Sequence, residues 1–166
     1  MGIETIIQLA IIGILIIIVY QDLKFRVLDL KYAIILLALC IGYNTIHPIL
    51  DYINAFQIAG FVLVNIMCLT LYFSVKNKQF INPINSKIGL GDIVFFLVIA
   101  PLFYIKAYIL FFVTGMLFSL LLYGVFIRFR EKQKKTIPLA GYLSMYLVII
   151  LLSNIFLNTT IFNLGI

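Results

Sequence analysis

The chain has 166 residues, of which 64% are hydrophobic and only 11% are charged, and its mean hydropathy is +1.20. Soluble domains have about 45–50% apolar and about 25% charged residues, so this composition excludes a soluble globular protein. It indicates a single membrane domain that covers residues 1–166. The formal net charge of +6 does not indicate a nucleic-acid partner, because the basic residues lie in short connectors between apolar runs, where they set membrane topology.

Six apolar runs follow one another along the chain. A helix rises about 1.5 Å per residue, and about 20 apolar residues are needed to cross the hydrocarbon core. The runs cover roughly residues 3–20, 32–46, 53–75, 90–105, 107–127 and 137–157. The fourth is short and is separated from the fifth only around Lys106, so these two are expected to form a tight helical hairpin. We therefore expect an all-α fold, a bundle of six transmembrane helices.

The basic residues predict the orientation of this bundle. With the N-terminus outside, eleven of the twelve fall in the three inner connectors and Lys106 alone falls outside. The inner residues are Lys24, Arg26, Lys31, Lys76, Lys78, Lys87, Arg128, Arg130, Lys132, Lys134 and Lys135. This bias in short loops predicts a cytoplasmic-membrane protein with both termini outside the cytoplasm. The first run has no basic segment before it and no cleavage pattern after it, so we expect a retained span and not a signal peptide.

Neither cysteine nor histidine indicates a metal site. Cys40 and Cys68 stand alone in apolar runs and form no C-x-x-C pair. His47 lies beside Pro48 in the first outer turn, where an interfacial residue is a more common role than a ligand. We expect no metal and no cofactor.

Two carboxylates stand out because of their expected depth in the membrane. Asp22 falls at the inner end of the first run, and Asp92 falls at the inner start of the fourth. Ionisable residues at membrane depth usually face a bundle interior or a water-filled cavity and are functional candidates. Gly89 directly precedes the fourth run and Gly91 lies at its start, and small residues let helices approach closely in a membrane. The two aspartates are therefore expected to meet.

Two adjacent carboxylates tend to share one proton. One can then activate a water as general base while the other donates a proton to a substrate carbonyl as general acid. The alternative is structural. Asp22 would then pair with Lys24 or Arg26 at the membrane interface, and Asp92 would N-cap the fourth helix.

Three segments resemble one family of membrane proteases. They are "YQDLKFRVLDL", "KIGLGDIVFFLVIAPLF" and "KKTIPLAGYLSMYLVIILL", and together they resemble the GxGD aspartyl proteases, in particular the type IV prepilin peptidases and the archaeal preflagellin peptidases. The resemblance implies a single transmembrane peptidase domain with Asp22 and Asp92 as the catalytic pair. It implies removal of a short basic leader from type IV pilin-like precursors at the cytoplasmic face, so the expected partners are these precursors and membrane lipid.

The chain also departs from the family pattern. Relatives usually carry Pro-Asn where this chain has Asp29 and Leu30, and often a lysine where it has Val94. Asp29 is expected to N-cap the second helix, with a third catalytic carboxylate as the alternative. The long bifunctional relatives carry a cysteine-rich insert, which this chain lacks together with any glycine-rich site for a methyl donor. No methyltransferase activity is expected.

The inner connector over residues 75–89 is expected to act either as a lid or as a solvated connector. Possible substrate or lid contacts are Lys24, Arg26, Asp29, Lys87 and Pro138. Other functions remain open at this stage. A small cation or proton transporter would use the same aspartates and needs a polar stripe through the bilayer. A presenilin-like intramembrane protease is indicated faintly by "PLA" at 138–140, and a non-enzymatic assembly factor would keep the fold with the aspartates unused.

Overall fold

The computed structural model describes residues 2–48, 51–78, 89–127 and 138–157. This part of the chain is helical and contains no strand. Its elements are α1 (Ile3–Phe25), α2 (Leu30–Ile46), α3 (Tyr52–Asn77), α4 (Leu90–Ile99), the short 3-10 helix η1 (Ala100–Leu102), α5 (Ile105–Ile127) and α6 (Leu139–Leu157). The all-α expectation is confirmed. Helix α1 continues five residues beyond the expected end of the first run, so Asp22 lies inside a helix.

The expected fourth span is wrong in its length. Helix α4 has only 10 residues, which corresponds to about 15 Å, and the chain then forms η1 and turns extended at Phe103. Pro101 explains the stop, because proline has no N–H and its ring clashes with the carbonyl four residues earlier. Four helices, α1, α3, α5 and α6, are long and apolar enough to cross a membrane, whereas α2 and α4 are shorter. The protein is therefore membrane-embedded, and its described residues form six α-helices, four of which are of spanning length.

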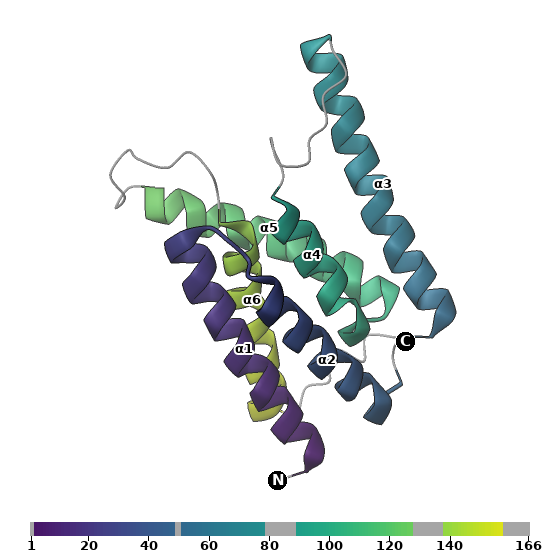
Figure 1. The fold of residues 1–166 in the computed structure, drawn as a ribbon, viewed down its shortest axis with the longest axis vertical. Coiled ribbons are helices and arrows are strands. Elements are labelled where there is room, and N and C mark those ends of the chain that lie inside the picture. Colours follow the sequence, from purple (N-terminus) through teal and green to yellow (C-terminus); the bar gives the residue numbers. More distant parts are fainter. Residues whose placement is uncertain (1, 49–50, 79–88, 128–137, 158–166) are drawn as a thin grey trace.

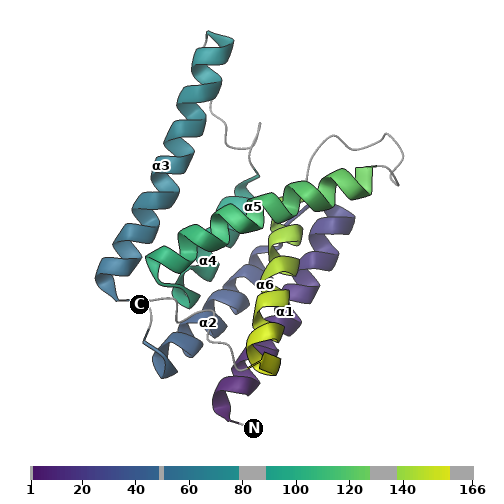
Figure 2. The same cartoon turned by 180° about the vertical axis from the view of Figure 1, so that it is seen from behind.

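The helices pack as an irregular bundle (Figures 1 and 2). Helix α6 lies antiparallel to α1 and also packs on α5, while α2 lies between α1 and α4. Helix α3 stands at the edge and contacts α4, α5 and η1. The C-terminal ends of α1 and α3 and the N-terminal end of α4 lie at the same end of the molecule.

Large apolar side chains fill the space between α1, α2, α4 and α6. Leu15, Leu36, Phe95 and Leu143 are almost completely buried there. Helices α4 and α5 hardly pack against each other, so the expected tight helical hairpin is wrong. Tyr108 links them near their connection, because its buried hydroxyl donates a hydrogen bond to the carbonyl of Phe96 at 3.0 Å. Burying this apolar surface fixes the relative positions of the helix ends, where the polar residues lie.

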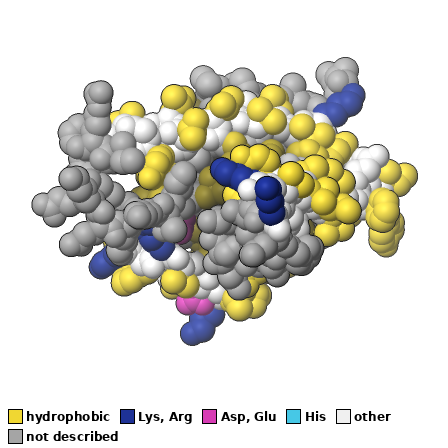
Figure 3. All heavy atoms as spheres, turned by 90° about the horizontal axis from the view of Figure 1, so that it is seen from above, with side chains coloured by type: hydrophobic (Ala, Val, Ile, Leu, Met, Phe, Trp, Pro, Cys, Tyr) yellow, Lys and Arg dark blue, Asp and Glu magenta, His cyan; other side chains and the backbone are white. Residues whose placement is uncertain are grey.

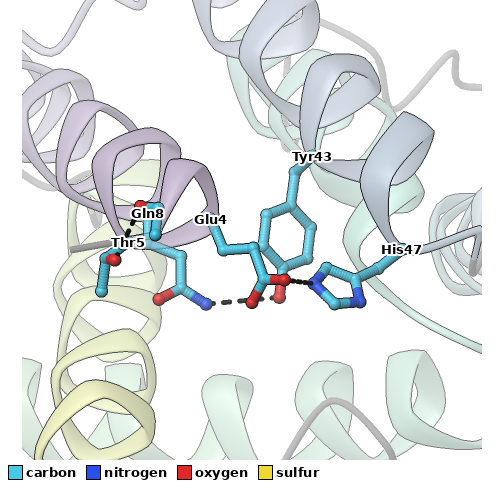
Figure 4. Close-up of polar contacts among 6 residues, drawn as sticks. Glu4, Thr5, Gln8, Tyr43 and His47 are labelled. Carbon is cyan, nitrogen blue, oxygen red and sulfur yellow. Dashed lines mark hydrogen bonds and ion pairs between the residues drawn. The ribbon is translucent and has the colours of Figure 1, made fainter.

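A polar cluster joins α1 and α2 at the end of the molecule opposite the aspartates (Figure 4). Gln8 donates a buried hydrogen bond to the hydroxyl of Tyr43 at 3.2 Å. The side chains of Glu4 and His47 lie 3.1 Å apart, Oε1 to Nε2, and the ring of His47 lies against that of Tyr43. The cluster ties the start of α1 to the end of α2.

Candidate active site

Asp22 and Asp92 meet at the N-terminus of α6. The first amides of a helix have no partner within the helix and are available to other groups. In α6, which begins at Leu139, the N–H of Gly141 donates to Oδ2 of Asp22 at 2.5 Å. The N–H of Ala140 donates to Oδ1 of Asp92 at 3.0 Å. Amides of two consecutive residues therefore hold one carboxylate each, and residues from three separate parts of the chain form one site.

The two carboxylates are close enough to act on each other. Asp92 experiences the charge of Asp22 directly and accepts a second backbone hydrogen bond from Gly89. Asp22 is only 7% exposed, and the charge of Arg26 acts on it from the end of α1. The positive end of the α6 dipole favours negative charge at this position. Backbone amides and the charge of Arg26 therefore stabilise an acidic pair in which Asp22 is buried and Asp92 is partly buried.

The first residues of α6 fit this close approach. Pro138 precedes the helix, is buried and has no N–H that needs a partner. A Cβ on Gly141 would lie 3.1 Å from Oδ2 and 3.2 Å from Cβ of Asp22, so only glycine leaves full room for the carboxylate. The sequence had indicated Pro138 only as a possible contact, and it had not indicated Ala140 or Gly141 as site residues. The signal was present as a proline and two small residues at the start of an apolar run.

The two glycines before and within α4 also lie at tight contacts. Gly89 is the N-cap of α4, and a Cβ there would lie 3.2 Å from Oδ2 of Asp92. A Cβ on Gly91 would lie 2.9 Å from Cβ of Leu28, in the connection between α1 and α2. Gly91 thus brings α4 against this connection, which follows directly on the helix that carries Asp22.

The structural alternatives for the two aspartates were Asp92 as the N-cap of the fourth helix and Asp22 paired with Lys24 or Arg26. The N-cap of α4 is Gly89, so the expectation that Asp92 caps this helix is wrong. Lys24 donates to the hydroxyl of Tyr20 at 2.7 Å and lies over aromatic rings of α1. Arg26 ends α1 in a left-handed conformation, and its N–H donates to the carbonyl of Asp22.

Asp29 has a structural position. It is the N-cap of α2, and its side chain accepts a hydrogen bond from the N–H of Lys31 at 3.1 Å. The expectation that Asp29 caps the second helix is therefore confirmed. Residues 79–88 of the inner connector, which include Lys87, lie outside the described residues.

Charged side chains gather at the end of the molecule where the two aspartates lie. The described basic residues there are Lys24, Arg26, Lys31, Lys76 and Lys78, and the acidic ones are Asp22, Asp29 and Asp92. Figure 3 views the molecule from this side and shows basic side chains around a hollow with an acidic side chain inside it. The arrangement offers two adjacent carboxylates, one buried and one partly exposed, next to a charged surface. Such a pair can activate a water and protonate a carbonyl without a metal.

Comparisons with protein-family models, with curated proteins and with solved structures gave no significant match.

Proposed function

We propose that this protein is a membrane aspartyl endopeptidase that removes the basic leader from type IV pilin-like precursors. The observation that carries the proposal is the pairing of Asp22 and Asp92 on consecutive amides of α6. Two helices with no sequence proximity each place a carboxylate at this one helix end. A purely structural role would need only one carboxylate to stabilise the free amides of α6.

The chemistry follows from one proton shared by the pair. A water held between the carboxylates attacks the scissile carbonyl carbon, and the ionised aspartate takes the proton of that water. The protonated aspartate gives its proton to the carbonyl oxygen, so a tetrahedral diol forms. When this diol collapses, the aspartate that took the proton of the water gives it to the peptide nitrogen, and the other aspartate takes a proton from one diol hydroxyl. The C–N bond breaks, the nitrogen leaves as the new amino terminus, and the pair again shares one proton. The α6 amides bind one oxygen of each carboxylate throughout and keep the two groups oriented.

The expected topology puts this site at the cytoplasmic face. The positive-inside rule places the basic end of the molecule, with Asp22 and Asp92, on the cytoplasmic side and both termini outside. The apolar helix of a precursor would then lie among the spans in lipid, with its scissile bond at the level of the aspartates. Lys24, Arg26 and Pro138 are the described residues at this end that we propose as substrate contacts.

The polar residues within the spans argue against the transporter alternative. A transport path needs polar groups free to meet an ion or proton along the bilayer. The side chains in question instead donate to carbonyls of their own helices at 2.7–2.8 Å. They are Asn65, Thr70, Thr114 and Ser119. The two paired carboxylates lie together at one end of the described helices, where a peptidase site is expected.

A presenilin-like intramembrane protease is the second candidate. The segment Pro138-Leu139-Ala140 resembles the third motif of those proteases, and here Ala140 holds Asp92. The two candidates differ in where the substrate is cut. A prepilin-type enzyme cuts before the apolar helix of its substrate, and a presenilin-like enzyme cuts inside it, so sequencing of the new amino terminus separates them.

The proposal is tested by co-expression with a pilin-like precursor. Asp22→Asn and Asp92→Asn should each reduce leader removal by about 10²–10⁴-fold, the usual contribution of a general acid or base. Asp29→Asn is the matched control, because asparagine also serves as an N-cap, and this variant should cleave like the wild type. All variants should be present in the membrane in equal amounts. Full cleavage by either Asp22→Asn or Asp92→Asn would refute the proposal.

A further inference from the structure

Ser144 on α6 carries a buried hydroxyl without a partner. The residue is 0% exposed, and its Oγ makes no hydrogen bond within the described part of the chain. Ser119 shows the usual solution for a buried hydroxyl, because it donates to the carbonyl of Gly115 on its own helix at 2.8 Å. An unpaired buried hydroxyl costs stability, so the position of Ser144 calls for a specific reason.

The helix geometry directs this hydroxyl toward the aspartate pair. Ser144 lies three residues after Gly141, so the two share one face of α6. That face packs against α1, which runs antiparallel to α6. Helical side chains point back toward the N-terminus of their own helix. The Cβ of Ser144 therefore tilts toward the turn that holds Gly141, whose N–H donates to Asp22.

Asp22 has a second carboxylate oxygen that can receive this hydroxyl. Its Oδ2 accepts from Gly141, which leaves Oδ1 for a further donor. Asp92, in contrast, receives two backbone hydrogen bonds, from Ala140 and Gly89. The carboxylate of Asp22 and the unpaired hydroxyl of Ser144 thus belong to the same interface between α1 and α6.

We propose that Ser144 is a positioning residue for the pair Asp22 and Asp92. Its hydroxyl donates a hydrogen bond to Oδ1 of Asp22. The contact forms by rotation of the serine side chain or through one water molecule. Asp22 is then held by two donors, as Asp92 is by Ala140 and Gly89, and its carboxylate keeps one orientation toward the water and its partner. The inference deepens the proposed function and rests on it for its catalytic consequence, although the contact itself exists independently of any substrate.

The contact is tested first without a substrate. In the purified protein, the infrared C=O band of protonated Asp22 is assigned from its loss in Asp22→Asn. Ser144→Ala should move this band to higher wavenumber, because the carbonyl loses a hydrogen bond. Ser119→Ala is the matched control, since it also removes one buried hydroxyl from a spanning helix, and it should leave the band in place.

The unfolding temperature distinguishes a Ser144 hydroxyl that bonds to Asp22 from one that stays unpaired. If the Ser144 hydroxyl is truly unpaired, its removal should raise the unfolding temperature and leave the Asp22 band unchanged, and this result would overturn the inference. If the contact exists, the unfolding temperature should stay the same or fall. With a precursor as substrate, we expect Ser144→Ala to reduce kcat about tenfold with little change in KM.

The outcomes distinguish the inference from the proposed function. A band shift in a protein that cleaves no precursor supports the Ser144 contact and refutes the peptidase proposal. Normal precursor cleavage by wild type and Ser144→Ala, with an unchanged band, supports the peptidase proposal and refutes the role of Ser144.

Discussion

Replacing Gly141 by alanine should slow catalysis by displacing the carboxylate of Asp22, while the protein still folds. An added Cβ would lie 3.1 Å from Oδ2 of Asp22, whereas ordinary contacts begin at 3.4 Å, so the carboxylate must move by about 0.3 Å. A displacement of about 1 Å at a catalytic group costs about 10²-fold in rate, so about 0.3 Å should cost roughly fourfold. Overpacking costs about 1–3 kcal/mol, and the helix gains about 0.5–1 kcal/mol from alanine over glycine. The net loss of stability should therefore be about 0–2.5 kcal/mol.

The assay measures precursor cleavage in membranes together with the unfolding temperature in detergent. Gly13→Ala is one control, because an added Cβ there meets no atom within 4 Å. Gly115→Ala is the second, because its Cβ would lie 2.7 Å from the side chain of Leu143 on α6, a clash that does not involve the aspartates. At matched unfolding temperature, only Gly141→Ala should cleave the precursor roughly fourfold more slowly than the wild type. Wild-type cleavage by Gly141→Ala, or an equal loss in Gly115→Ala, would refute the reasoning.

Three further predictions concern stability, each measured by thermal or denaturant unfolding in detergent. Gly91→Ala should lower the free energy of unfolding by about 1–3 kcal/mol, because its Cβ would lie 2.9 Å from the Cβ of Leu28 and relief requires a backbone shift; an unchanged value would contradict this tight contact. Asp29→Ala should cost about 1 kcal/mol as the N-cap of α2 is lost, and Asp29→Asn should cost clearly less, so equal losses would argue against capping. Tyr43→Phe should cost about 1–3 kcal/mol because the buried amide of Gln8 loses its acceptor, and a neutral result would show that this amide finds another partner.

Local sequence rules accounted for most helix boundaries. The apolar runs predicted six helices, and α2 and α3 begin beside the acidic N-caps Asp29 and Asp51. The length predicted for the fourth helix was wrong because the apolar run continues from residue 90 to 105, whereas the α-helix ends before Pro101 and a 3-10 turn follows. Proline was the stronger signal, since a missing N–H and a ring clash stop a helix whatever the apolarity of its neighbours.

The sequence by itself determined that the protein is helical and membrane-embedded, because apolar side chains must leave water and a backbone in lipid must satisfy its own hydrogen bonds. It also singled out Asp22 and Asp92, since carboxylates at membrane depth are rare and costly. Only the tertiary structure decided how they are held. The groups that bind them are the amides of Ala140 and Gly141, and a backbone N–H has no signature in the sequence. Its availability depends on where a helix begins and on which distant helices pack against that end.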